Sequence, residues 1–215
     1  MTLLIAIDSS QQLTYTASLS SNMHNIKLLS QRIEHILSKN NVAGKWHWSK
    51  LSRKTREKLK KPLADLLEEF PSVHINILEH KRPANVERKG WFIYTVPARL
   101  AQKLEPWLQG KYGELVLLVD DDYAVVKGGR GTRHFIEQLV RQFAIRLTGK
   151  ETSLRDGAEI WATIKQPNGK ILNFRAGIAE KDSEWIGIID LYLGIYDSSP
   201  ELLLELGNVH ASKIE

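Results

Sequence analysis

Three aspartates stand where an acidic side chain could do chemistry. Asp8 ends a short apolar run at the N-terminus, and Asp120, followed by Asp121 and Asp122, ends the most apolar run of the chain. Asp190 lies in an apolar stretch with helical spacing. Open α/β sheets bind ligands outside the carboxyl ends of their strands. We therefore expect Asp8 and Asp120 to approach each other if their strands are parallel neighbours, with Asp190 arriving from a helix packed on the sheet.

Carboxylates that lie so close repel one another, and a hard divalent cation such as Mg²⁺ or Mn²⁺, which prefers oxygen ligands, relieves the repulsion. Two such ions about 3.5–4 Å apart can activate a water and stabilise the leaving oxygen in phosphodiester cleavage. The pattern predicts a metal site formed by Asp8, Asp120, Asp122 and Asp190, of which Asp8, Asp120 and Asp190 would be catalytic. Each acid also has a structural alternative: a turn or cap for Asp8, a solvated loop for Asp120 and Asp122, and a partnered acid within a helix for Asp190.

Positive charge gathers in one part of the chain. The formal net charge is +5, from 30 Lys and Arg against 25 Asp and Glu, and residues 50–61 carry seven cations and the single acid Glu57. Such a cluster can line up phosphates, although it can equally be a solvated helix face. Trp46, His47 and Trp48 precede it, and aromatic side chains beside cations can stack bases or anchor a loop to the core. The expected partner is DNA or RNA, bound through Lys45, Trp48, Lys50, Arg53 and Lys54.

The segment Lys127-Gly128-Gly129-Arg130-Gly131-Thr132 precedes a predicted helix and could hold a phosphate at the helix N-terminus, with Arg130 and Arg133 meeting a backbone phosphate. A flexible loop is the alternative. The segment lacks the Gly-Lys-Ser/Thr ending of a P-loop, which gives a nucleoside triphosphatase little support. No Gly-x-Ser-x-Gly elbow supports a Ser-His-Asp hydrolase.

The elements that must position these residues alternate between strand and helix patterns. The predicted strands are residues 3–8, its hairpin partner 13–19, 73–78, a weaker 91–96, the uniformly apolar 115–119, and 159–165 with 170–174 around the turn Pro167-Asn168-Gly169. The predicted helices are residues 25–38, a helix from a Ser49 cap to about residue 70 that Pro62 kinks or divides, 97–108, 132–147 with Thr132 as cap and Gly149 as terminator, and 183–196. Residues 202–206 are expected to form a short closing element.

Length and composition favour one α/β domain over residues 1–215. The 42% hydrophobic and 26% charged residues argue against wholesale disorder. With no cysteine, disulfides and thiolate chemistry are excluded. The apolar runs are too short to cross a bilayer, and no basic stretch precedes the first of them, so we expect a cytoplasmic protein without a signal peptide or a membrane partner. The sequence does not indicate an oligomeric state.

Short segments of the chain resemble a known family. They are Ile5-Ala6-Ile7-Asp8-Ser9-Ser10, Lys45-Trp46-His47-Trp48-Ser49-Lys50-Leu51-Ser52, Leu118-Val119-Asp120 and Ile188-Ile189-Asp190-Leu191-Tyr192-Leu193-Gly194. In this order they are similar to parts of the family called domain of unknown function 3800, and together they span most of the chain. The resemblance implies a ribonuclease-H-like mixed sheet flanked by helices, here with an added C-terminal hairpin, and a metal-dependent nuclease site at Asp8, Asp120 and Asp190. Ser9 stands where the family has Glu, and Ile189 where it has Ala.

Two functions follow from these patterns. The first is an enzyme that hydrolyses phosphodiester bonds with Mg²⁺ or Mn²⁺. The second is a catalytically inactive ribonuclease-H-like protein that binds nucleic acid or a protein partner, which Ser9 in place of Glu favours. A PIN-like nuclease is a third alternative, but there the first strand feeds directly into a helix, whereas residues 13–19 are predicted to form a hairpin strand.

Overall fold

A seven-stranded mixed sheet forms the centre of the computed structural model, which describes residues 2–9, 15–81, 90–108, 112–120, 130–155, 157–179 and 183–214. The order of the strands across the sheet is β5-β6-β4-β1-β2-β3-β7. Their bounds are β1 (Thr2–Ser9), β2 (Tyr15–Asn22), β3 (His74–His80), β4 (Glu114–Val119), β5 (Ile160–Lys165), β6 (Ile171–Ile178) and β7 (Val209–Ile214).

Strand direction decides which residues share an edge of this sheet. β1 runs parallel to β4, β4 to β6, and β3 to β7, whereas β2 is antiparallel to both of its neighbours and β5 is antiparallel to β6. Consequently β1, β4, β6, β3 and β7 all point the same way. Their carboxyl ends meet at one edge, where α/β sheets commonly place their ligands.

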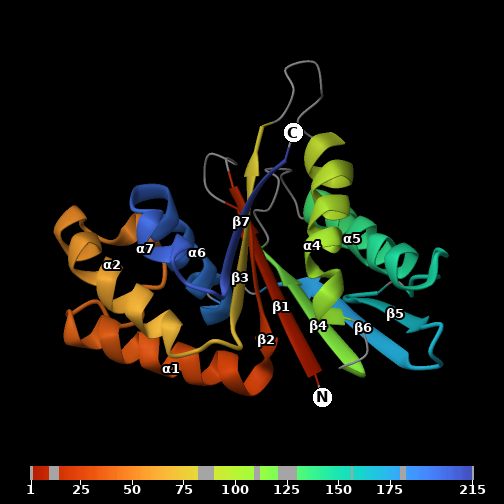
Figure 1. Cartoon of the computed structure of the whole chain (residues 1–215), viewed down its shortest axis with the longest axis horizontal. Helices are drawn as coiled ribbons and strands as arrows, with labels where there is room; N and C mark the ends of the chain where they lie inside the picture. The colour runs from red at the N-terminus through yellow and green to blue at the C-terminus, as the bar shows by residue number, and fades with distance from the viewer. Residues whose placement is uncertain are drawn as a thin grey trace.

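Helices cover both faces of the sheet and make an α/β architecture. On one side lie α1 (Met23–Lys39), α2 (Arg53–Glu68), α6 (Glu184–Ser198) and the short α7 (Glu201–Leu204); on the other lie α4 (Val96–Leu108) and α5 (Arg130–Thr148) (Figure 1). A 3₁₀ turn, η1 (Trp48–Lys50), precedes α2, and a π-helical turn, η2 (Trp91–Thr95), precedes α4.

The side chains of β1 alternate between two hydrophobic cores, one on each face of the sheet. Leu3, Ile5 and Ile7 are buried with the side chains of α4 and α5, while Leu4 and Ala6 are buried with those of α1, α2 and α6. Successive side chains of a strand point to opposite faces. Asp8 therefore belongs to the α6 side of the sheet.

Most predicted elements are confirmed. The first strand, its antiparallel partner, residues 73–78 and 115–119, and the first and last long helices are present within a few residues of the predicted bounds. The turn at Pro167-Asn168-Gly169 joins β5 to β6 as predicted, with Gly169 at φ 82°. The hairpin was expected as an addition to the core sheet. Instead its second strand, β6, pairs with β4 inside the sheet.

One predicted strand is wrong. Residues 91–96 are helical, since Trp91, Phe92 and Ile93 bury their side chains in the turn that leads into α4. Val96, Leu100, Leu104 and Leu108 continue that buried face at a spacing of four residues, which is a helical period and outweighs the β propensity of the aromatic residues.

The starts and ends of three helices also differ from the prediction. Ser52, not Ser49, caps α2 by accepting the N–H of Thr55, because Ser49 is already inside η1. Pro62 neither ends nor divides α2. Thr132 is a buried residue inside α5 rather than its cap, while Gly149 ends that helix with φ 72° as predicted.

Two features of the sheet were not foreseen. Strand β7 lies at the edge beside β3, although its sequence does not alternate clearly. On β4, whose residues 115–119 are uniformly apolar, Val116 and Leu118 are only half-buried and pack against the core on the α6 side. None of the helices in these ranges combines the length and apolar character needed to cross a bilayer.

Candidate functional site

Asp8 and Asp120 lie side by side at the carboxyl ends of β1 and β4. The last pair of the ladder between these strands is Ile7 with Val119, and the N–H of Asp120 donates to the carbonyl oxygen of Ile7 at 3.0 Å. The two acids thus occupy the next position on neighbouring strands, which lie about 4.8 Å apart in a sheet. This is the parallel arrangement that the sequence argument required.

The side chain of Asp8 is nearly buried. It is only 7% exposed, and its Oδ1 accepts the N–H of Ser9 at 2.6 Å. Asp120 is half-buried. A nearly buried carboxylate needs partners for its charge. The ends of β1 and β4 bring two carboxyl groups, whose oxygens are the ligands that hard cations prefer, to neighbouring positions.

Asp190 is half-buried on the side of α6 that contacts the segment before α2. Its Oδ2 accepts the N–H of Trp48 at 2.8 Å and lies 3.5 Å from Nδ1 of His47. Burial raises the pKa of the Asp190 carboxyl, although the Trp48 N–H, His47 and Lys50 oppose this by favouring the charged form. An acid within an apolar helix needs a polar partner, and for Asp190 this partner is the N–H of Trp48, the first residue of η1.

Two glycines on the same side of α6 make room for that segment. A Cβ atom at Gly187 would lie 2.4 Å from Cβ of Trp46, and one at Gly194 would lie 2.1 Å from Cγ of Trp48. Gly187, Asp190 and Gly194 are three and four residues apart, so they line one side of the helix. We call these three residues the α6 seat. Trp48, which is 8% exposed, is packed into the core rather than presented to a ligand.

The exposed cations that flank the seated tryptophans have no ion pair. Lys45, Lys50, Arg53 and Lys54 are exposed, and none makes an ion pair among the described residues, although Lys50 is close enough to Asp190 to favour its charged form. Further along α2, by contrast, Lys60 and Lys61 pair with Glu57 and Asp65 at 2.7 and 2.8 Å. The first turn of α2 thus presents charge that is available to an anionic partner.

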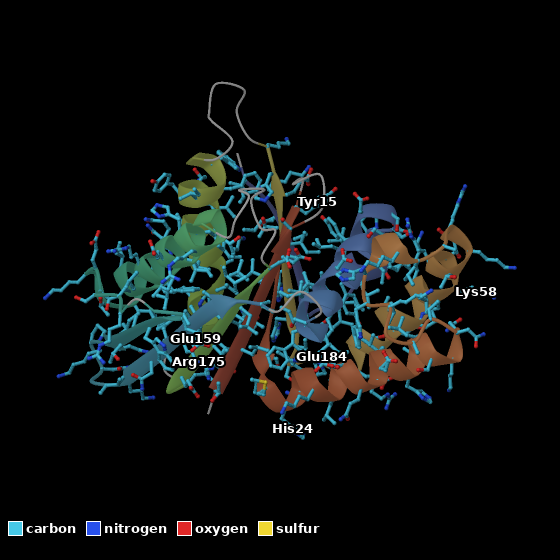
Figure 2. The ribbon with its side chains drawn as sticks, turned by 180° about the vertical axis from the view of Figure 1, so that it is seen from behind. Tyr15, His24, Lys58, Glu159, Arg175 and Glu184 are labelled. Atoms are coloured by element: carbon cyan, nitrogen blue, oxygen red, sulfur yellow. The ribbon has the colours of Figure 1, made fainter. Side chains whose placement is uncertain are left out.

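Arg56 ties the backbone of this segment to α2. Its Nε donates to the carbonyl oxygen of Leu51 at 2.9 Å, and its Nη2 to that of Ser49 at 3.0 Å. Lys58, two residues further along α2, lies at the opposite end of the molecule from Glu159 and Arg175 (Figure 2). We call residues 45–54 the basic segment.

The remaining predicted residues are placed differently or lie outside the described residues. Nη2 of Arg133 donates to the carbonyl oxygen of Gly157 at 2.9 Å, so this guanidinium is engaged within the fold. Asp121, Asp122 and the side chain of Arg130 lie outside the described residues. Within the ranges given above, no group of three or more His, Asp or Glu side chains is arranged to hold a metal ion.

The sequence reasoning missed one polar cluster, which lies near the carboxyl ends of β1 and β3. Nε2 of His80, at the end of β3, lies 2.8 Å from Oγ1 of Thr16, and Nε1 of Trp91 donates to its Nδ1 at 3.4 Å. Nδ1 is therefore the acceptor, and Nε2 carries the proton that is donated to Thr16. Burial lowers the pKa of His80 to about 4. Because Thr16 pairs with Ser9, this cluster lies on the face opposite Asp8, and no local sequence signal joins its three residues.

Comparison with known proteins does not assign a family. No family model, no curated protein and no solved structure matches the chain. The geometry of the strand ends and the charge of the basic segment are therefore the features of the molecule that bear on its function.

Proposed function

We propose that this chain is a divalent-metal-dependent nuclease whose site is centred on Asp8 and Asp120. The observation that carries the proposal is their placement at matching positions on the ends of two parallel, hydrogen-bonded strands. Two carboxylates one strand spacing apart repel when both are charged, and Mg²⁺ or Mn²⁺ offsets that repulsion with the oxygen ligands it prefers.

We further propose that β3-β2-β1-β4-β6 is a ribonuclease-H-like core, extended by β7 at one edge and β5 at the other. The support is the order and direction of these strands: β2 alone runs against the other four, and the two acids end the two strands at the centre. The chain resemblance to the family of domain of unknown function 3800 implies the same core.

The proposed donors are carboxylate oxygens, which the cation prefers, although Asp8, Asp120 and Asp190 do not form a group of three ligands among the described residues. Asp8 contributes a nearly buried carboxylate, Asp120 contributes a half-buried one beside it, and Asp190 is proposed as a third ligand through Oδ1, since Oδ2 accepts the Trp48 N–H. Asp122 is proposed as a further ligand on sequence grounds alone. When bound, the metal would activate a water and stabilise the leaving oxygen of a phosphodiester.

The basic segment would hold the nucleic acid. Lys45, Lys50, Arg53 and Lys54 are exposed and make no ion pair among the described residues, so phosphates can approach them. Because the α6 seat and Arg56 hold the backbone of this segment, less backbone entropy is lost when a partner binds to it.

A second candidate is a protein that binds nucleic acid without cutting it. The engagement of Asp190 by the Trp48 N–H favours this candidate, because that carboxylate already has a structural task. Ser9, where the resembling family has Glu, favours it as well.

The two candidates differ in their response to metal and to loss of one carboxylate. Labelled single- and double-stranded DNA and RNA are incubated with the wild type, Asp8→Asn and Asp120→Asn in Mg²⁺, Mn²⁺ or EDTA. Asp197→Asn, at an exposed position of α6, is the matched control. The nuclease proposal expects cleavage with metal that only the first two variants lose. Equal cleavage by all four proteins, or none by any, would reject it, and salt-sensitive binding that ignores EDTA would support the second candidate.

A further inference from the structure

Two histidines meet on the α4 side of the sheet, near the amino ends of β3 and β7. These strands are parallel neighbours (Figure 1), and the register pairs Asn76 of β3 with His210 of β7. His74 and Asn76 are two residues apart, so their side chains share a face with Leu78, which is buried in the core with α4 and α5. Nδ1 of His74 lies 3.4 Å from Nε2 of His210. We call His74 and His210 the histidine pair.

The distance between these two nitrogens matches that between two ligands of one zinc ion. A good hydrogen bond from a nitrogen donor spans about 2.7–3.2 Å, which is shorter. Two imidazole nitrogens that bind a tetrahedral Zn²⁺ at about 2.0–2.1 Å are about 3.3–3.4 Å apart, whereas a square-planar ion would bring them to about 2.8–3.0 Å. The ring centroids of the pair are 5.6 Å apart and the ring planes differ by 14°. Since the torsion that turns a histidine ring is soft, a small rotation directs both lone pairs at a shared ion.

Trp107 of α4 packs against the histidine pair. The centre of its ring system lies 3.8 Å from that of His74 and 6.3 Å from that of His210. Because the His74 ring is already held by this contact, it loses less freedom when it binds a ligand. An imidazole that binds a cation also gains positive charge, which the face of an indole attracts.

His74 is in the protonation state that a metal ligand needs. Burial, and after it the neighbouring His210, lower the pKa of His74 to about 4. Its imidazole is therefore neutral at pH 7, and a neutral imidazole keeps one nitrogen lone pair for a metal. His210 is exposed, which leaves the pair open to an ion from solvent.

Buried polar atoms without a partner lie beside the histidine pair. Ser20 is 2% exposed and pairs with His74 in the register, while Asn76 is 3% exposed and pairs with His210. Within the described residues, neither Oγ of Ser20 nor Nδ2 of Asn76 has a hydrogen-bond partner. Buried polar atoms are normally satisfied by protein, water or a ligand. Both atoms can donate to the water or anion that completes the coordination of an ion.

We propose that His74 and His210 form a binding site for Zn²⁺, with the remaining coordination positions taken by water or a small anion. Open positions of this kind are typical of zinc sites that exchange a ligand. In the part of the chain that the structure describes, no group of three His, Asp or Glu side chains is arranged around an ion. Two ligands in place of the four of a structural zinc site imply about half of the binding free energy, which corresponds to a Kd of roughly 1–200 µM.

This site is separate from the proposed nuclease centre. It offers nitrogen ligands, which suit zinc, whereas Asp8 and Asp120 offer the oxygen ligands that magnesium prefers. It also lies on the opposite face of the sheet from Asp8, near the amino ends of its strands rather than their carboxyl ends. The proposal does not depend on nuclease activity.

Isothermal titration of the full chain with Zn²⁺ in excess Mg²⁺ tests the site, because magnesium competes for carboxylates but not for imidazoles. The wild type should bind one zinc ion in the stated range, and His74→Gln and His210→Gln should each weaken binding by at least about tenfold. His35→Gln, at an exposed position of α1, is the matched control and should bind as the wild type does. In nitrogen-15 spectra, zinc should shift the imidazole signals of the histidine pair and leave those of His35 unchanged.

Three results would overturn this proposal. They are a wild type that binds no zinc up to about 1 mM, binding by His74→Gln and His210→Gln as tight as that of the wild type, and zinc binding that Asp8→Asn alone removes. The last result would place the ion at the ends of β1 and β4 and would leave the nuclease proposal standing. If His74→Gln does not fold, His210→Gln decides the question, because that side chain is exposed.

Discussion

Substituting Gly194 by alanine tests whether α6 is shaped to receive the segment that carries Trp48. The added Cβ would lie 2.1, 2.2 and 2.5 Å from three atoms of the Trp48 ring. Non-bonded carbon atoms approach to about 3.5–4.0 Å at their optimum. The ring must therefore move by more than 1 Å, and neither α6 nor the buried indole can give way without disturbing the packing around it.

The size of the effect follows from two opposed contributions. Alanine in place of glycine inside a helix is worth about 1 kcal/mol in its favour. Overpacking of a well-filled core costs about 1–3 kcal/mol, and partial loss of Trp48 burial adds to that cost. We expect a net loss of about 1–2 kcal/mol in the free energy of unfolding, which for a chain of this length lowers Tm by about 2–8 °C.

Thermal unfolding followed by circular dichroism and by tryptophan fluorescence measures this loss. Gly90→Ala is the matched control, because a Cβ there meets nothing within 4 Å, and its Tm should stay the same or rise slightly. A Gly194→Ala protein as stable as the wild type would refute the idea that α6 seats this segment tightly.

The remaining predictions concern the seat, the buried histidine and the basic segment. Asp190→Asn keeps an oxygen for the Trp48 N–H and should be at least as stable as the wild type, whereas Asp190→Ala should lose about 1–3 kcal/mol in urea unfolding. Burial raises the folded pKa of Asp190 above 3.8, so the folded protein holds the proton to a higher pH than the unfolded chain does. The free energy of unfolding therefore falls as pH rises from 3.8 through the folded pKa. The gain in stability of Asp190→Asn over the wild type should consequently be larger at pH 7 than at pH 4. His80 has a folded pKa of about 4, below its ordinary value of 6.5, so the unfolded chain takes up the proton first and stability should fall as pH drops from 6.5 to 4. His80→Gln should flatten this fall, and an unchanged pH dependence in that variant would contradict the prediction. Nucleic-acid binding should weaken, and its salt slope should drop by about 2–3, when three unpaired cations are changed together to alanine, namely Lys50, Arg53 and Lys54. The control is a triple variant in which three cations that make ion pairs are changed to alanine, namely Arg32, Lys61 and Lys213. Its salt slope should be nearly the same as that of the wild type.

Local patterns predicted the parts of this fold that depend on local chemistry. The apolar run before Asp8, the helical spacing after Asn25 and the turn at Gly169 each specify their element through neighbouring residues, and each is present. The placement of Asp8 beside Asp120 was also accessible, because both acids follow buried strands and parallel strands end at the same edge.

Features that depend on tertiary contacts were not accessible. Residues 91–96 have strand-forming side chains, yet they become helical because their apolar surface continues that of α4. The partner of Asp190 lies 142 positions away at Trp48, and no spacing rule connects the two. Asn208 donates to the carbonyl oxygens of Leu67 and Val73, contacts that fix the entry to β7 and that its local sequence does not indicate.

A crystal of the chain soaked in Mn²⁺ tests the central claim most directly, since manganese scatters anomalously and its position does not depend on activity. We expect an anomalous peak between the carboxylates of Asp8 and Asp120 in the wild type, and its loss in Asp8→Asn. A strong peak elsewhere with none at these strand ends, or a peak that Asp8→Asn leaves unchanged, would contradict the proposed metal site.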